Sequence, residues 1–399
     1  MKSALRALVV IGLLIVVMIG AAGWVAYSFL NTPASDDASE AVFEVRPHES
    51  FKTIAGRLEE SGLIRSARFL ELYARISHVG SKVRVGEYAV RRNARPKDVL
   101  AIITSGKSIE YSISIPEGYN IFEIADAFAK KNICTHDEFL KIVRDPQFVH
   151  EMLGEDAPSL EGYLFPETYS YTKFTSPTGI VKMMISRFKE NWSKIEALGE
   201  LPMSKHDLVT LASIIEKETG APEERPLISS VFYNRMKINM RLQTDPTVIY
   251  GIWEKTGSWD RNISKQDLLT PNKYNTYTFT GLPYGPIANP GFDALKAAAQ
   301  PATSEYLFFV SKNNGTHIFS KDLKGHVKAI EQYQLDNKAR EGHSWRELSK
   351  RGKEGAEQSK ASPRVPPAEV AGAALKKPAK AGKVTAPPIK QAPSPKRAD

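Results

Sequence analysis

An uncharged stretch near the N-terminus constrains this chain more than any other sequence feature. It runs from Ala7 to Leu30, 24 residues without Asp, Glu, Lys or Arg. As a helix it would be about 36 Å long, at ~1.5 Å per residue, which is enough to cross the hydrocarbon core of a bilayer. The sequence therefore predicts one transmembrane helix over residues 7–30.

The residues around this stretch predict its orientation. Lys2 and Arg6 precede it, and the aromatic residues Trp24 and Tyr27 lie near its far end. Because positive residues stay on the cytoplasmic side and aromatic rings favour the membrane interface, we expect residues 1–6 inside and the rest of the chain outside. The substrate of such a chain would be extracytoplasmic.

A cleavable signal peptide is the competing interpretation of the same stretch. The small residues Gly20 to Gly23 would suit a signal peptidase. The uncharged run is longer than the usual 7 to 15 residues of a signal peptide, however, so a retained anchor is the prediction.

Composition and charge indicate a globular protein without a basic folded surface. The 399 residues are 42% hydrophobic and 25% charged, which suits two or three domains. The net charge of the chain is +9. Residues 351–399 contribute +7 of it, because they contain eleven Lys and Arg and four Asp and Glu. We therefore predict no nucleic-acid partner. The single cysteine, Cys134, allows no internal disulfide.

The sequence has no metal or serine-nucleophile motif. The eight His have no ligand spacing, and His150-Glu151 lacks the second His of a zinc-protease helix, because Gly154 stands in its place. A Gly-x-Ser-x-Gly elbow is also missing. We predict no metal and no cofactor.

An internal repeat follows the anchor. Each copy begins with a strand-like lead, Val42 to Val45 or Ile113 to Ile115, and a Pro. The apolar positions Ile54-Ala55, Leu58, Leu63-Ile64 and Phe69-Leu70 recur 70 residues later as Ile124-Ala125, Phe128, Ile133-Cys134 and Phe139-Leu140. The pattern resembles LysM modules, which bind glycan chains, and predicts such a module over 42–107 and a half-repeat over 108–150. Strands are also expected at 83–90 and 108–115. Alternatively, the repeated positions are simply core.

The stretch 208–219 predicts a helix that ends in an acid. At 100° per residue Leu211, Ala212 and Ile215 fall near Leu208, and Glu218 falls at the border of that stripe. Glu216 points elsewhere, so only Glu218 is expected to be partly buried. Burial would raise its pKa and keep a proton available for general acid catalysis. The plain alternative is a solvated Glu in an ordinary amphipathic helix.

The helix stop and three loop-like runs complete the expected site. Gly220 and Pro222 end the helix, and a second helix over 223–236 should pack through Leu227, Val231 and Phe232. Polar and aromatic residues gather in the runs 161–169, 241–251 and 274–291. Their Tyr, Asn, Gln, Thr and Asp suit a neutral polyhydroxyl ligand in an open groove. Ordered structural turns are the alternative.

Four long motifs carry a resemblance to a known family. They are Ala212–Thr219, Val231–Arg235, Met240–Gly251, and Tyr274–Tyr277 with Gly281–Pro283. In this order they resemble the endolytic murein transglycosylases, the MltG or YceG-like family, from the anchor to about residue 340. The resemblance implies an enzyme held in the bacterial inner membrane by a single pass. Its periplasmic catalytic domain, residues 151–341, would cut nascent peptidoglycan strands and leave 1,6-anhydro-muramic acid ends.

The resemblance also implies roles for particular residues. The second Glu of the Glu-Lys-Glu-Thr motif is the catalytic acid of that family, which places the acid at Glu218 here. We also expect Thr219, Gln243, Asp245, Asn275, Tyr277 and Glu167 to bind substrate. On chemical grounds rather than from the resemblance, oxygens of Gln243, Asp245, Asn275 or Glu167 would stabilise positive charge near the anomeric carbon. The implied partners are glycan strands, the membrane and peptidoglycan synthases.

The expected fold is α+β: the anchor, LysM-like α/β modules of short mixed strands and helices, and a mixed α+β catalytic domain with an open groove. Residues 342–399, rich in Ala, Lys and Pro, are predicted to be a disordered basic tail. A second class of function remains open at this point, a non-catalytic, membrane-tethered scaffold that binds peptidoglycan for cell-wall synthases.

Overall fold

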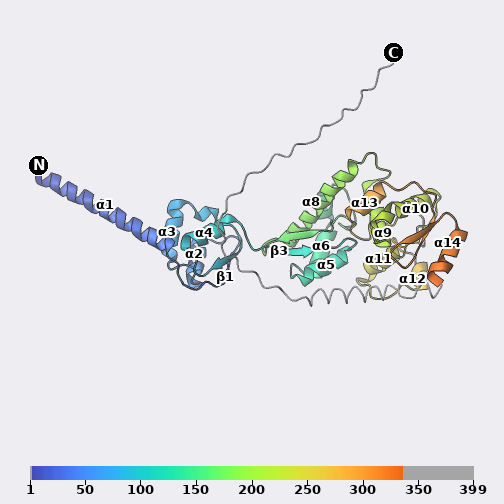
Figure 1. The fold of residues 1–399 in the computed structure, drawn as a ribbon, viewed down its shortest axis with the longest axis horizontal. Helices are drawn as coiled ribbons and strands as arrows, with labels where there is room; N and C mark the ends of the chain where they lie inside the picture. Colours follow the sequence, from blue (N-terminus) through green and yellow to red (C-terminus); the bar gives the residue numbers. More distant parts are fainter. Residues whose placement is uncertain (1, 336–399) are drawn as a thin grey trace, which may run out of the picture. The chain divides into compact units, whose positions relative to one another are not determined.

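The structure is a computed structural model that describes residues 2–335. It is mostly helical, with three small sheets of two strands each (Figure 1). All three sheets are antiparallel. The predicted α+β class is confirmed. The predicted tail, 342–399, lies outside the described residues.

The chain begins with α1 (Lys2–Asn31), whose apolar part is Leu8–Asn31 with a mean hydropathy of 2.7. Its length and composition fit a single-pass anchor or a signal sequence.

The first folded unit contains two strands and four helical segments. They are β1 (Glu40–Val45), α2 (Phe51–Glu60), α3 (Ala67–Ser77), η1 (Gly80–Lys82), β2 (Gly86–Arg91) and α4 (Pro96–Ser105). Strand β1 pairs with β2, with Phe43 opposite Tyr88. The Ser50 side chain accepts a hydrogen bond from the Thr53 N–H and so caps α2. The buried faces of the helices and strands form a core of their own.

The second unit also begins with a strand and two helices and pairs that strand with a later one. It contains β3 (Tyr111–Ser114), α5 (Ile121–Lys130), α6 (His136–Arg144), α7 (Pro146–Leu153) and β4 (Thr168–Tyr171), and β3 pairs with β4. Helix α5 begins 70 residues after α2, and its capping box joins Asn120 and Glu123. Unlike the first unit, the second packs its apolar side chains into the large core that also contains α9.

The remaining elements complete this large core. They are α8 (Pro177–Glu196), α9 (Lys205–Glu218), η2 (Pro222–Glu224), α10 (Arg225–Lys237), α11 (Asp245–Thr256), α12 (Lys265–Leu269), α13 (Phe292–Ala299), β5 (Phe308–Ser311), β6 (His317–Ser320), α14 (Leu323–Ile330) and a last π-helical turn, η3 (Glu331–Leu335). The expected second helix is η2 followed by α10, and Val231 and Phe232 are buried on it.

Helix α9 lies at the centre of this core and packs against α10, α11 and α13 (Figure 1). Every residue from Leu208 to Ile215 is buried, including Val209 and Thr210. The prediction of an amphipathic helix with one apolar stripe was therefore wrong, because neighbouring segments cover the other side as well. One of these is the loop at Gly162, where φ is +87° and a Cβ would lie 2.6–2.7 Å from Pro286 and Val209 side-chain atoms.

Candidate active site

The carboxyl-terminal end of α9 places Glu218 at a surface groove. Glu218 is the last residue of the helix, and Thr219 is extended (φ −143°, ψ 139°), so the helix stops there. Ile215, one turn earlier, is fully buried, whereas Glu218 is half-buried and Lys217 is exposed. The rigid, buried helix thus holds one carboxyl group at the edge of the core.

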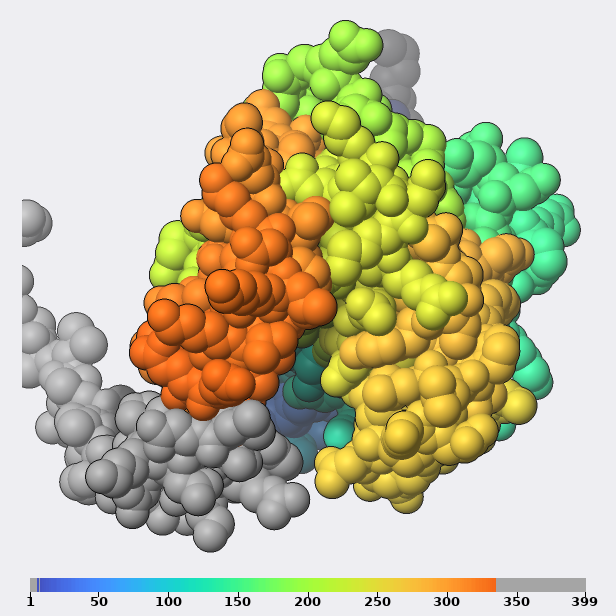
Figure 2. All heavy atoms as spheres, turned by 90° about the vertical axis from the view of Figure 1, so that its right-hand side faces the viewer, coloured from blue at the N-terminus to red at the C-terminus, as the bar shows by residue number. Residues whose placement is uncertain are grey.

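The groove beside Glu218 has a cavity of about 430 Å³. One wall comes from β5 and α14, and the other from residues 242–245 with Tyr277. Figure 2 shows the two walls as the orange and yellow segments on either side of an open gap. Cavities of this size are typical of ligand sites. Glu218 also lines a second cavity of about 430 Å³, with Thr219, Phe309 and His317 among its other lining residues.

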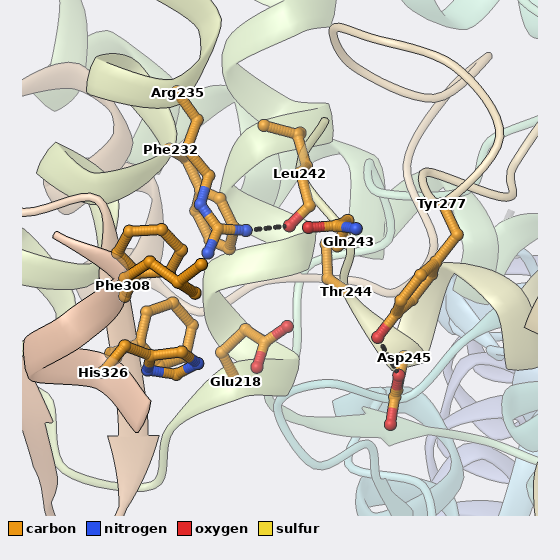
Figure 3. Close-up of a pocket in the computed structure, with 12 residues that line it drawn as sticks. Glu218, Phe232, Arg235, Leu242, Gln243, Thr244, Asp245, Tyr277, Phe308 and His326 are labelled. Carbon is orange, nitrogen blue, oxygen red and sulfur yellow. Dashed lines mark hydrogen bonds between the residues drawn. The ribbon is translucent and has the colours of Figure 1, made fainter. Parts of the chain in front are cut away.

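Arg235 connects the two walls of the groove. Its guanidinium group donates to the Leu307 carbonyl (2.7 Å), just before β5. It also donates to the Leu242 carbonyl (2.5 Å) on the opposite side (Figure 3). These bonds fix a buried cation near Glu218. Its charge lowers the pKa of the Glu218 carboxyl, but other effects are larger.

Burial raises the pKa of Glu218 to about 7, and the negative charge of Asp245 adds to this increase. The Thr244 hydroxyl lies close enough to lower the pKa, although within the described chain its Oγ1 makes no hydrogen bond of ordinary geometry. A carboxyl group with this pKa holds a proton in a large fraction of molecules at neutral pH, as a general acid requires.

Asp245, Tyr277 and Gln243 lie on the wall opposite β5 (Figure 3). The Tyr277 hydroxyl donates to Asp245 Oδ1 at 2.6 Å. Gln243 has a φ of 51°, a left-handed conformation that is uncommon outside glycine and is often found at functional sites. The structure brings these three side chains together with Glu218.

Comparison with known protein families matches residues 43–332 to the YceG-like family. The chain belongs to this family. An endolytic murein transglycosylase of Bacillus subtilis (strain 168) is 32% identical over 335 residues, which cover 79% of this chain and 91% of that protein. A protein of the same name from Streptococcus pneumoniae (strain D39) is 26% identical over 367 residues, covering 83% of this chain and 66% of its own.

A solved YceG-like structure has a similar fold. The 2.6 Å crystal structure of the putative yceG-like protein lmo1499 from Listeria monocytogenes is 32% identical and superposes with a TM-score of 0.50, covering 73% of this chain and 99% of that one.

Three of the predicted binding residues of this YceG-like protein, Asn275, Thr219 and Glu167, make contacts that hold the fold together. Asn275 is fully buried, and its amide donates to the carbonyls of Asp267, Leu268 and Thr270 at 2.8–3.2 Å. It shapes the loop that carries Tyr277 and does not line the groove. The Thr219 hydroxyl accepts a hydrogen bond from the Ala221 N–H, but Thr219 still lines the second cavity.

Glu167 lies outside the groove. It precedes β4 and forms an ion pair with Arg187 of α8, at 2.5 and 3.0 Å. The paired Arg187 orients this carboxylate within the second unit. Sequence alone grouped Glu167 with the site because its polar, aromatic run resembled the other two.

The burial of the Glu216 side chain differs from the prediction. We expected only Glu218 to be partly buried, yet the Glu216 side chain is just 6% exposed. It pairs with Arg225 at 2.8 Å and accepts a hydrogen bond from the Gly291 N–H at 3.0 Å. Burial raises its pKa, which the amide and Arg225 counteract. Glu216 therefore joins α9 to α10 and to the start of α13.

Three groove residues were not expected from the sequence: Arg235, Phe308 and His326. His326 stacks on Phe308 with ring centroids 4.9 Å apart. Its Nδ1 has no hydrogen-bond partner among residues 2–335, and burial with the nearby Arg235 lowers its pKa. Arg235 belongs to the motif Val231–Arg235, which could have indicated it as a site residue. No sequence motif surrounds Phe308 or His326. Within the same residues, no three His, Cys, Asp or Glu side chains group as metal ligands.

Proposed function

We propose that this chain is a membrane-anchored endolytic lytic transglycosylase that acts on peptidoglycan. The observation that carries the proposal is the half-buried Glu218 carboxyl, with a pKa of about 7, at the centre of an open groove. Relatives that match most of the chain are named endolytic murein transglycosylases, which supports the same substrate class here.

Glu218 would act first as a general acid. Its proton goes to the β-1,4 oxygen between N-acetylmuramic acid and N-acetylglucosamine, and the bond from that oxygen to the anomeric carbon breaks. Positive charge develops at the anomeric carbon, where Asp245 and the Gln243 amide oxygen would stabilise it.

The second step uses a nucleophile from the substrate itself. The 6-hydroxyl of the muramic acid attacks the anomeric carbon and gives its proton to the Glu218 carboxylate, which restores the acid. The product is a 1,6-anhydro ring, and no water is consumed. Because an intramolecular hydroxyl has a high effective concentration, one carboxyl group can serve where most glycosidases need two.

The two cavities at Glu218 support cleavage within strands. A glycan that runs through both would place sugars on each side of the carboxyl group, with Tyr277 in one cavity and Thr219 in the other. Aromatic rings and hydroxyl groups suit sugar faces and hydroxyls. We further propose that the first unit, 42–107, is a LysM-like glycan-binding module, and that the retained anchor keeps the enzyme beside membrane synthases whose strands it terminates.

The decisive experiment incubates the full-length protein in detergent with uncrosslinked glycan strands and identifies the new ends by mass spectrometry. Internal cuts with 1,6-anhydro ends are expected. Reducing ends would instead indicate a hydrolase with Asp245 as its base. Intact strands that remain bound would favour the non-catalytic scaffold.

A further inference from the structure

Helix α3 has an apolar stripe that residues 2–335 leave largely exposed. Phe69, Leu72 and Ile76 are 46%, 53% and 72% exposed. Their i, i+3, i+7 spacing places them on one side of the helix, while Leu70 and Ala74 on the other side are buried in the core of the first unit. The exposed side is therefore not needed for the folding of this unit.

Basic residues border the stripe. Arg68 and Arg75, seven residues apart, are exposed on the same side of α3 next to Leu72, and Arg65 precedes the helix. Glu71 is the acidic neighbour and pairs with Arg75 at 3.1 Å. An apolar stripe edged by arginines suits a surface that combines hydrocarbon with anionic groups, as a phospholipid leaflet does.

The stripe continues onto the predicted membrane helix. A cavity of about 570 Å³ lies between α1 and α3, lined by Ala22 and Val25 of α1 and by Leu72 and Ile76 of α3, among other residues. The rings of Phe29 and Phe69 lie 5.5 Å apart at one side of it. Because Ala22 and Val25 belong to the span that would lie in lipid, the exposed face of α3 adjoins a lipid-facing surface.

The length of the connection supports the same arrangement. Helix α1 ends at Asn31 and β1 begins at Glu40. The eight residues between them, 32–39, span at most about 30 Å, so the first unit cannot move far from the bilayer that holds α1.

We propose that α3 is an in-plane membrane helix of the first unit. The Phe69–Leu72–Ile76 stripe enters the outer leaflet, acyl chains fill the cavity beside α1, and Arg68 and Arg75 contact lipid phosphates. This inference rests on the proposed retained anchor. It gives the first unit a second attachment to the membrane besides the covalent one.

Site-directed fluorescence quenching tests the inference on the full-length chain. In a Cys134→Ser background, a fluorophore is attached to Leu72→Cys or Ile76→Cys, and each protein is reconstituted in vesicles of phosphatidylethanolamine and phosphatidylglycerol with brominated acyl chains. The matched controls are Glu60→Cys, exposed on α2, and Val16→Cys, within α1. Quenching at Leu72 and Ile76 should approach that at Val16 and exceed that at Glu60 by about twofold or more.

Each remaining outcome decides a different point. If Val16 is quenched but Leu72 and Ile76 are no more quenched than Glu60, the inference is overturned and α3 is left for a protein partner. If Val16 is not quenched, the anchor itself is not in the bilayer, and both proposals are overturned.

Discussion

Glu216 and Glu218 lie two residues apart on α9 but have different environments. Glu216 is matched by Arg225 and the Gly291 amide, so its negative charge is compensated inside the protein. Within residues 2–335, no hydrogen bond or ion pair of ordinary geometry joins Glu218 to another side chain. Because burial outweighs the attraction of the nearby Arg235, the Glu218 carboxyl favours its protonated form. These contacts suggest a structural role for the first residue and a chemical role for the second.

We expect Glu218→Gln to reduce anhydro-product formation by about 10²–10⁴-fold, because the amide has no transferable proton. The fold should be retained. Since the folded-state pKa of Glu218 is raised from 4.5 to about 7, the free energy of unfolding of the wild type falls as pH rises from about 4.5 through 7, and a neutral amide removes that penalty. The variant should therefore be at least as stable as the wild type at pH 8, with no gain below about pH 4.5. Product assays and thermal unfolding at both pH values measure this.

Glu216→Gln should have the reverse effect. It leaves Arg225 buried, and among residues 2–335 the acids that remain within 4 Å are Glu117 (3.6 Å) and Asp293 (3.7 Å). Breaking a buried pair costs about 3 kcal/mol, or roughly 10 °C in Tm for a core of this size. Activity measured well below the Tm should remain near that of the wild type. If Glu216→Gln abolished anhydro products in a folded protein while Glu218→Gln retained them, the assignment of the acid would be wrong.

The pH dependence should identify Asp245 as the charge that acts on Glu218. Activity requires protonated Glu218, so kcat/KM should fall as pH rises through about 7. Asp245→Asn removes a negative charge that raises this pKa, and the fall should then move to lower pH. Tyr277→Phe, which removes only the hydroxyl bonded to Asp245 (2.6 Å), is the matched control and should leave its position unchanged. An unmoved profile in Asp245→Asn would contradict the electrostatic argument.

At the scale of elements, the β5–β6 hairpin forms part of one wall of the groove. Glu224 of η2 is hydrogen-bonded to this hairpin. Glu224 is buried and accepts hydrogen bonds from the His317 N–H (2.9 Å), while its other oxygen lies 2.7 Å from His317 Nδ1. The hairpin carries Phe308 and Phe309 into the groove, so its position sets the width of the site.

Glu224→Gln should loosen this wall without touching the acid. We expect faster hydrogen exchange in residues 308–320 and a higher KM, with a smaller change in kcat, because the substrate then has to order the hairpin. Glu305→Gln is the control, since Glu305 pairs with Lys321 of the same region but is exposed at the surface. Unchanged exchange in Glu224→Gln would show that the hairpin is held by packing alone.

At the scale of the whole molecule, the first unit has a core of its own, whereas the second shares the large core with α9. Helices α3 and α4 of the first unit contact α1, and a short connection joins this unit to α1. The proposed membrane attachment therefore acts on the first unit and through it on the enzyme.

We expect the mature protein in membranes to keep its N-terminus. Intact-mass analysis of the membrane-extracted chain should find residues 1–30 present, because the 24-residue apolar run exceeds the length of a signal-peptide core. A mature form that starts after Ala22 or Gly23 would contradict this and would also remove the lipid-facing surface beside α3.

Local patterns in the sequence predicted the membrane helix, several helix and strand boundaries and the family of this protein. Three features could be predicted because each depends only on residues that are close together in the chain. They are the uncharged run long enough for a bilayer, the Pro after a strand, and the helix that stops before Gly220. Family membership followed from four ordered motifs. The prediction of an acid at the end of α9 came from helical geometry with the resemblance, and it stays a prediction until the variants are measured.

Only the tertiary structure shows which residues from distant parts of the chain are in contact. Periodicity predicts one apolar face, but it cannot say that the loop at Gly162 and other segments cover the opposite face of α9. Glu216 is buried because Arg225 and Gly291 lie beside it, Asn275 turns inward to three carbonyls, and His326 reaches the groove from a distant helix. Such contacts join residues far apart in the chain, and their free energies depend on the burial of charges and polar groups, which no local stretch of sequence contains.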